Sequence, residues 1–181
     1  MPNRRVHDNE KHIHFVTFSC YKRRKYLQHD RARKIVIGNL GSRLSKHDGL
    51  CLGFAIMPDH VHALLWFPEP GQLSVLMNKW KSQSSLAVQQ LYQTEFPNYW
   101  GTIDESDPVW QTRYYDFNIW TRQKVEEKLD YMHMNPVRAG LVGRAVDWLA
   151  SSARWYIESK SVGLPISWPP GLETDDDCNA G

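Results

Sequence analysis

Two histidines, His60 and His62, stand two positions apart in the apolar segment MPDHVHALLWF, residues 57–67. Side chains of a β-strand alternate between its faces, so these two imidazoles would share one face. Such a pair suits a divalent metal ion, with a further ligand supplied by another element. The pair also has a purely structural interpretation, as two ordinary histidines beside a core. However, placing two polar rings on one face of an apolar strand costs free energy, which favours a use for them.

Tyr131 and Asn135 lie four residues apart near the end of a predicted helix, so they share a helix face. A tyrosine can act as a covalent nucleophile, and an asparagine carbonyl oxygen can bind a metal ion. The alternative is a tyrosine at the edge of the apolar stripe, with its hydroxyl in water. Asn135 would then cap the helix ahead of Pro136.

Together these residues suggest a phosphoryl-transfer site. A metal ion on His60 and His62, completed by Asn135, would polarise a phosphate group that Tyr131 attacks. A phenol is a poor nucleophile at neutral pH, so the metal ion would have to do much of the activation. The resulting phosphotyrosine bond would retain the energy of the phosphodiester for rejoining.

Other residues near these motifs could compete for the same roles. Tyr114 and Tyr115 lie in the aromatic stretch WQTRYYDFNIW, where they could pack in the core or stack on unpaired bases. His133 is close to Tyr131 in sequence but about 200° away around the helix, so no role is assigned to it.

Basic residues are concentrated in the N-terminal part of the chain. Residues 1–50 contain twelve Lys and Arg against four Asp and Glu, although the whole chain has a net charge of only +2. This asymmetry indicates a polyanionic partner, nucleic acid foremost, whereas a solvated helix face is the alternative explanation. The densest cluster is Lys22, Arg23, Arg24 and Lys25, which could line the path of DNA or form a solvated loop.

Length and composition exclude several classes of protein. The 181 residues suggest one domain, and no apolar run approaches the roughly 20 residues of a membrane helix. The first ten residues have no apolar signal region. Three scattered cysteines, Cys20, Cys51 and Cys178, support neither a disulfide framework nor a zinc site. We therefore expect a cytoplasmic protein without membrane contact, with a disordered acidic end over residues 173–181.

The pattern of apolar residues and turn residues predicts an α+β fold. Pro58 and Asp59 favour a tight turn between two of the strands, Asp30 and Thr121 are candidate helix caps, and Pro136 is expected to end the last helix. Residues 97–108 are expected to form a loop, and 109–120 a short strand or extended segment. The order of elements suggests an antiparallel sheet covered by helices, in a ferredoxin-like or RRM-like arrangement. The predicted strands are 12–21, 50–57 and 60–67, and the predicted helices are 30–46, 72–93 and 121–134.

Four blocks of this sequence resemble the REP-associated tyrosine transposases, which are single-tyrosine HUH nucleases. PDHVHALLWF resembles the His-hydrophobe-His strand of HUH nucleases, and LDYMHMNPVRAGLV resembles the tyrosine helix of the transposases. The other two blocks are HFVTFSCYKRRKYL and WQTRYYDFNIW. The resemblance spans residues 4–156. The four blocks appear in the expected order, which makes it more specific than the histidine pair alone.

The resemblance implies a fold and a reaction. Residues 1–156 would form a ferredoxin-like HUH transposase domain, followed by an extension over residues 157–181. The implied reaction is the cleavage and rejoining of single-stranded DNA at palindromic REP hairpins. It uses Mg²⁺ or Mn²⁺, forms a 5′-phosphotyrosine and frees a 3′-hydroxyl. The implied protein is a monomer or dimer, associated with the bacterial nucleoid.

The resemblance also assigns residues. His60 and His62 match the metal-binding pair, and Tyr131 matches the nucleophile. Asn135 falls where related enzymes place a polar third metal ligand, for which related transposases often have Gln. Arg4 and Arg5 fall in the N-terminal stretch that reads a short sequence beside the hairpin, through backbone and base contacts.

Two other functions use the same residues. A non-catalytic single-stranded nucleic-acid-binding module would need only the basic and aromatic side chains, and Tyr131→Phe would then change nothing measurable. A metal-dependent hydrolase of small phosphoesters would show activity without a covalent protein–DNA product.

Overall fold

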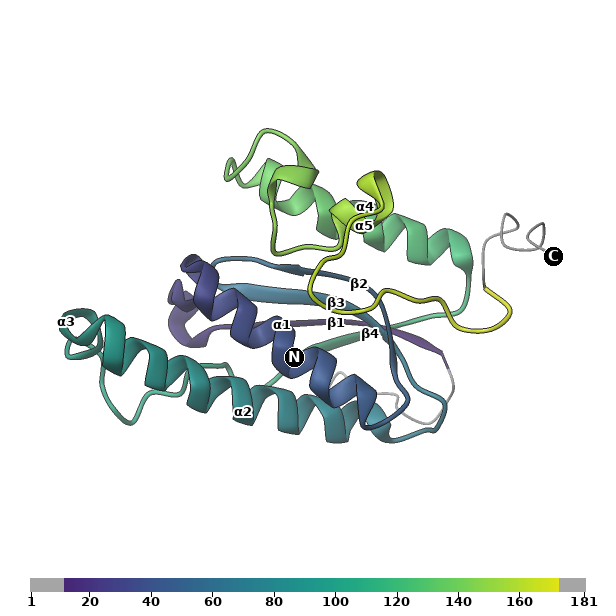
Figure 1. Ribbon diagram of the computed structural model, residues 1–181. Coiled ribbons are helices and arrows are strands. Elements are labelled where there is room, and N and C mark those ends of the chain that lie inside the picture. The colour runs from purple at the N-terminus through teal and green to yellow at the C-terminus, as the bar shows by residue number, and fades with distance from the viewer. Residues whose placement is uncertain (1–11, 173–181) are drawn as a thin grey trace, which may run out of the picture.

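The computed structural model describes residues 12–172, which fold around a four-stranded antiparallel sheet with helices on both faces (Figure 1). The spatial strand order is β2-β3-β1-β4. With α1 between β1 and β2, and α2 between β3 and β4, this is the βαββαβ order of a ferredoxin-like fold. It confirms the predicted α+β class. The strands are β1 (Ile13–Ser19), β2 (Leu50–Ile56), β3 (His60–Trp66) and β4 (Tyr115–Ile119). The helices are α1 (Asp30–Ser45), α2 (Gln72–Glu95), α3 (Pro97–Trp100), α4 (Arg122–Arg138) and α5 (Ala153–Glu158), with 3₁₀ turns η1 (Tyr21–Arg23), η2 (Tyr26–Gln28) and η3 (Ala145–Asp147).

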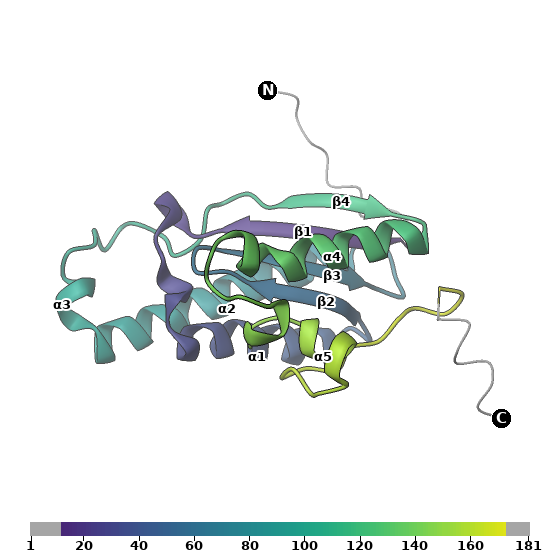
Figure 2. The ribbon, with the colours of Figure 1, turned by 90° about the horizontal axis from the view of Figure 1, so that it is seen from above.

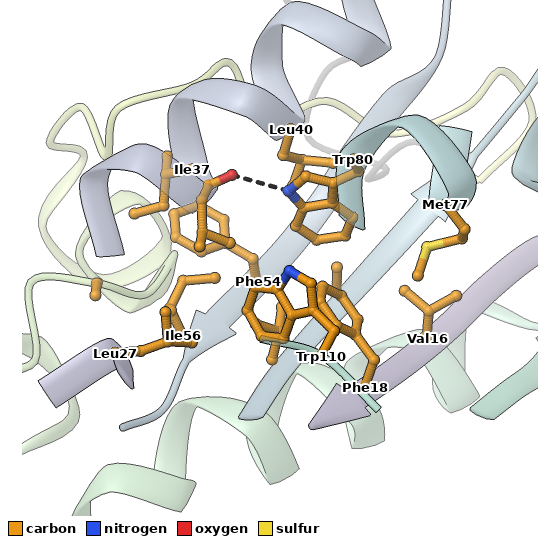
Figure 3. Close-up of a cluster of buried hydrophobic side chains, with 14 of the residues drawn as sticks. Val16, Phe18, Leu27, Ile37, Leu40, Phe54, Ile56, Met77, Trp80 and Trp110 are labelled. Carbon is orange, nitrogen blue, oxygen red and sulfur yellow. Dashed lines mark hydrogen bonds between the residues drawn. The ribbon is translucent and has the colours of Figure 1, made fainter. Parts of the chain in front are cut away.

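The two faces of the sheet are covered by different helices. Helices α1 and α2 lie on one face, and α4 and α5 lie on the other (Figures 1 and 2). The larger core lies between the sheet and helices α1 and α2. It surrounds the fully buried indole of Trp80, whose Nε1–H donates to Val36 O at 2.9 Å (Figure 3). Because Trp80 belongs to α2 and Val36 to α1, the packing of the indole ring and its hydrogen bond both hold α2 against α1.

Strand β3 contributes to both cores by alternation. Val61, Ala63 and Leu65 face the larger core, and Leu64 faces the smaller core beneath α4. His60 and His62 have the parity of Leu64, so they lie on the α4 face. The predicted apolar stripe of α4 is confirmed, because its members are buried in this smaller core; they are Val125, Leu129 and Met132.

Several predicted local features are confirmed. Strands β2 and β3 form the expected antiparallel hairpin across Pro58 and Asp59, with a β-bulge between Cys51 and Gly53. Thr121 caps α4, because its hydroxyl accepts a hydrogen bond from Lys124 N at 3.3 Å.

Two local expectations are wrong, and a third is confirmed. Asp30 is the first residue of α1 rather than its cap, which is His29, and the Asp30 carboxylate pairs with Lys34 Nζ at 2.6 Å. The expected loop at 97–108 begins with the short helix α3. The short strand expected within 109–120 is confirmed, because β4 occupies Tyr115–Ile119.

Pro136 does not end α4, in contrast to the prediction. Helix α4 continues through it to Arg138, and Pro136 is buried. Proline lacks the N–H that would bond the preceding turn, but it lies in the final turn, where Ala139 N still donates to Asn135 O at 2.9 Å. Asn135 therefore remains within the helix, four residues after Tyr131.

The outer edge of β2 is covered by the chain after α4. Ser152 N donates to Phe54 O at 2.9 Å, and Ile56 N donates to Ala150 O at 2.8 Å. Further along, the Tyr156 hydroxyl donates to Leu52 O and Ser167 N donates to Cys51 O. The residues that close this edge thus extend past position 156, where the sequence predicts the domain boundary.

Some predictions fall on residues that the structure does not describe. Arg4, Arg5, Cys178 and the acidic end at 173–181 lie outside the described range. Cys20 and Cys51 are both buried and are not in disulfides. No helix between residues 12 and 172 combines the length and apolar character needed to cross a membrane.

Candidate metal and nucleophile site

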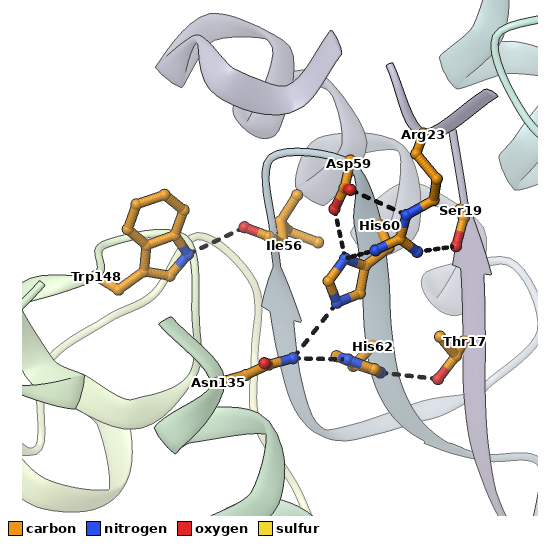
Figure 4. A network of polar contacts seen from close by, with 9 residues as sticks. All are labelled: Thr17, Ser19, Arg23, Ile56, Asp59, His60, His62, Asn135 and Trp148. Atoms are coloured by element: carbon orange, nitrogen blue, oxygen red, sulfur yellow. Dashed lines mark hydrogen bonds and ion pairs between the residues drawn. The ribbon is translucent and has the colours of Figure 1, made fainter. Parts of the chain in front are cut away.

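The structure brings His60, His62 and Asn135 together. Asn135 Nδ2 lies 2.9 Å from His62 Nε2 and 3.4 Å from His60 Nε2 (Figure 4). The imidazoles come from β3, and Asn135 comes from α4, which packs across this face of the sheet. The two imidazole rings are roughly perpendicular, with centroids 4.8 Å apart. Two ring nitrogens and one amide group therefore converge on one small region.

Asp59 determines which nitrogen of His60 carries the proton. Its Oδ1 lies 2.7 Å from His60 Nδ1, and because a carboxylate only accepts hydrogen bonds, Nδ1 is the donor. His60 Nε2 then carries a lone pair and faces Asn135. In metal sites, the histidine ligands are commonly oriented by a carboxylate that accepts a hydrogen bond from the other ring nitrogen.

His62 is oriented in the same sense by Thr17 of β1. The Thr17 hydroxyl lies 2.8 Å from His62 Nδ1. Because Asn135 Nδ2 donates toward both imidazoles, His62 Nε2 is an acceptor and its Nδ1–H donates to Thr17. Thr17 is directly opposite His62 in the β1–β3 register, so the sheet itself provides this partner.

Burial favours the neutral form of both imidazoles. It is the main cause that lowers the pKa of His62 to about 3, and the charges of His60, Arg23 and Lys128 act in the same direction. Burial also lowers the pKa of His60 below its ordinary value, although the hydrogen bond to Asp59 opposes it. Neutral imidazole is the form that binds metal ions.

Tyr131 is on the same face of α4, one turn before Asn135. Its ring is 45% exposed and meets His62 edge-on at 5.6 Å between centroids. The phenol is therefore open to solvent beside the imidazole pair.

Two cations flank the Tyr131 ring, and sequence reasoning did not single them out. Lys128 Nζ lies 5.7 Å from the ring centroid, and the Arg138 guanidinium lies at the same distance. Lys128 also lies over Phe15 and Phe117. The i, i+3 spacing of Lys128 and Tyr131 was the available signal, since such residues are neighbours on a helix.

Arg23 differs from the rest of the predicted basic cluster, because it reaches the histidine site. Its Nε pairs with Asp59 Oδ2 at 3.0 Å, and its Nη1 donates to Ser19 Oγ at 2.9 Å (Figure 4). Lys22 and Arg23 both have left-handed backbone angles, with φ of 53° and 55°. This conformation is unfavourable for non-glycine residues and is typical of functional sites.

The remaining cations of the cluster have other surroundings. Lys22 Nζ and Arg24 Nη2 both pair with Asp107 Oδ2, at 3.0 and 2.6 Å, and their hydrogen bonds lower the pKa of Asp107. Lys25 is exposed beside an aromatic pocket described below. Contact of these three residues with DNA stays a prediction.

The competing residues have structural partners. His133 is buried and lies 2.7 Å from Ser152 Oγ, away from the imidazole pair. Tyr114 packs against the larger core, and Tyr115 packs against the smaller one. Over residues 12–172, no group of three or more His, Cys, Asp or Glu side chains is placed to hold a metal ion. The candidate set thus consists of two imidazoles and one amide.

The fold and the site together define a class of protein in which a histidine pair on a ferredoxin-like sheet lies beside a helix that carries a tyrosine. Comparison with known proteins supports this class. The family model described as "Transposase IS200 like" matches residues 8–135. The chain belongs to this family of DNA-processing enzymes.

One sequence relative and one solved structure point to a narrower group within this family. A Haemophilus influenzae protein, whose name assigns it to the REP-associated tyrosine transposases, is 26% identical over 122 residues. The match covers 65% of this chain and 65% of that protein's length. The solved structure of a REP-associated tyrosine transposase bound to a REP hairpin is similar in fold, with a TM-score of 0.68 and 18% identity. It covers 96% of this chain and 94% of that one.

Proposed function

We propose that this protein cleaves and rejoins single-stranded DNA at palindromic REP-type hairpins, through a covalent link to Tyr131. The observation that carries the proposal is the convergence of His60 Nε2 and His62 Nε2 on the Asn135 amide, one helical turn from Tyr131. Membership of the IS200-like transposases and similarity to a transposase bound to a REP hairpin support the DNA substrate.

The donor set fits a divalent metal ion. With their Nδ1 atoms on Asp59 and Thr17, both histidines turn their Nε2 atoms toward Asn135. The amide ends of an asparagine are exchanged by a half-turn of its side chain, so Asn135 can offer an oxygen to the same region. Oxygen and imidazole ligands suit Mg²⁺ or Mn²⁺. When bound, such an ion would polarise the scissile phosphate.

Tyr131 performs the covalent step. Its Oη attacks the phosphorus and loses its proton to solvent, forming the P–Oη bond of a 5′-phosphotyrosine. The bond between phosphorus and the 3′ oxygen breaks, and that oxygen leaves as a 3′-hydroxyl after taking up a proton. The reverse attack by a 3′-hydroxyl rejoins the strand and frees Tyr131. Neither direction needs a further co-reactant.

The cations near Tyr131 stabilise the negative charge of the phosphate. Lys128 and Arg138 lie on either side of the nucleophile in sequence, and each lies 5.7 Å from its ring centroid. Arg23 adds a third positive charge, held beside His60 by Asp59. Charges fixed near the reacting phosphate stabilise the transition state without reorganisation.

The test is a denaturing gel with a labelled hairpin oligonucleotide that carries single-stranded flanks. Wild-type protein with Mn²⁺ is expected to give a shifted covalent adduct and a free 3′ fragment. The adduct should be absent with Tyr131→Phe and absent with EDTA. Tyr115→Phe is the matched control, because Tyr115 also faces the smaller core, and it should form the adduct normally.

Two outcomes would contradict the proposal. Cleavage without an adduct would indicate a metal-dependent hydrolase. Retardation on a native gel without cleavage in any divalent metal would indicate a DNA-binding module without a catalytic tyrosine.

A further inference from the structure

A pocket outside the histidine site is lined by residues from the C-terminal end of α2, from α3 and from the turns that follow β1. Its volume is about 450 Å³, within the roughly 300–1,000 Å³ of small-molecule sites. Its walls combine aromatic rings with polar and basic side chains. The lining residues are Lys25, Gln28, His29, Tyr92, Phe96 and Tyr99.

The aromatic rings of this pocket surround Tyr92. The Tyr92 side chain is only 2% exposed, and the centroids of Phe96 and Tyr99 lie 5.2 and 5.6 Å from it. His29 stacks on Phe96, with centroids 4.2 Å apart and an interplanar angle of 19°. The Tyr99 side chain is 43% exposed. The pocket therefore presents ring surface to solvent.

The rim of the pocket suits a polar, negatively charged ligand. Lys25 is exposed and forms no ion pair with another residue in the range 12–172. Gln28 is also exposed and carries both an amide donor and an amide acceptor. A ring surface, a hydrogen-bonding amide and a free cation match the base, the base edge and the phosphate of one nucleotide.

The backbone joins this pocket to the histidine site. The Tyr92 hydroxyl donates to Tyr26 O at 2.8 Å, and Leu27 N donates to Pro58 O at 2.9 Å. Pro58 is two residues before His60. The turn that carries Lys25 and Gln28 is therefore hydrogen-bonded to the segment just before His60.

We propose that this pocket binds one unpaired nucleobase of the single-stranded DNA. The base stacks on the Tyr99 ring, Gln28 contacts its edge, and Lys25 pairs with its phosphate. Stacking of a base on an aromatic side chain is tolerant of sequence, so the pocket would position the strand more than select its sequence. The inference rests on the proposed function, because it takes single-stranded DNA as the ligand.

The test is a scan of the flanks with abasic sites. Each flank nucleotide of the hairpin oligonucleotide is replaced in turn, and the Kd is measured by fluorescence anisotropy in EDTA, so that no cleavage occurs. For wild-type protein, one abasic position should weaken binding about tenfold. Tyr99→Ala should bind the intact DNA about tenfold more weakly and lose the penalty at that position. Tyr99→Phe keeps the ring and should behave as wild type.

Two results would refute the proposal that this pocket binds a nucleobase. One is an unchanged Kd for Tyr99→Ala with intact DNA, with the thermal unfolding midpoint also unchanged. The other is a weakened Tyr99→Ala that retains the same abasic penalty at every position. A Lys25→Gln variant adds an independent check, since it should reduce the salt dependence of Kd by about one phosphate contact.

The covalent-adduct assay separates this inference from the proposed function. An adduct with wild-type protein, but no position whose penalty Tyr99→Ala removes, would refute the pocket and support the nuclease. The position-specific pattern without any adduct would support the pocket and refute the nuclease.

Discussion

Gly53→Ala tests how closely α4 must approach the sheet. Gly53 lies at the bulge of β2, beneath the helix that carries Tyr131 and Asn135. A methyl group there would overlap Leu129 Cδ2 and would lie 3.1 Å from Met132 Cε. It would also lie 3.0 Å from Ser152 Oγ. Favourable carbon contacts lie at about 3.5–4.0 Å, so all three neighbours must move.

The expected cost follows from two opposing effects. Overpacking of a buried site typically costs about 1–3 kcal/mol, whereas replacing a strand glycine by alanine gains about 0.5–1 kcal/mol through chain entropy. Leu129 and Met132 can give way partly, because the overlapping atoms end flexible side chains. We therefore expect the free energy of unfolding to fall by about 1–2 kcal/mol.

Urea unfolding followed by tryptophan fluorescence measures this change. Gly38→Ala is the matched control, because its new methyl would have no neighbour within 4 Å in the middle of α1. It should raise stability by up to about 1 kcal/mol. Mn²⁺ affinity, measured by calorimetry, should also fall in Gly53→Ala and not in Gly38→Ala, since α4 carries the proposed metal ligand Asn135. A Gly53→Ala protein at least as stable as wild type would refute the tight docking of α4.

Three further predictions concern single contacts. Asp59→Asn should lower Mn²⁺ affinity about 10- to 100-fold, because it removes the carboxylate that orients His60; unchanged affinity in calorimetry would exclude that role. Burial lowers the pKa of His133 from 6.5 to about 4, so the unfolded chain takes up a proton that the folded chain resists as the pH falls. Between about pH 7.5 and 4.5, His133 should lower the free energy of unfolding by about 2–3 kcal/mol. In urea unfolding, the stability of His133→Gln should therefore fall by about that much less than the wild type over the same pH range. Thr121→Ala should destabilise by about 1 kcal/mol through loss of the α4 cap, and an unchanged urea midpoint would contradict it.

Local patterns predicted the elements well. The alternation of apolar residues predicted the face of β3 that carries His60 and His62, and helical spacing predicted that Tyr131 and Asn135 share a face of α4. Each of these predictions depends on neighbours within a few residues. Pro136 was misjudged because burial within the last helical turn outweighed its local preference to end a helix.

Contacts between distant parts of the chain could not be found in this way. Thr17 reaches His62 from a strand 45 residues earlier, and Asp107 pairs with Lys22 across 85 residues. Such pairings depend on strand register and loop position, which spacing in the sequence does not encode. The distinct place of Arg23 within the basic cluster has the same origin, because it depends on a left-handed turn that no residue type there favours.

The covered edge of β2 has a consequence for biosynthesis. Phe54 obtains its outer hydrogen-bond partner from Ser152, 98 residues later in the chain. At translation rates of roughly 5–20 residues per second, the ribosome needs about 5–20 s to make that stretch. Until then the nascent sheet has an open edge that can pair with a neighbouring chain and start aggregation. The speed of translation therefore sets the minimum time for which the β2 edge of a newly made molecule lacks these partners.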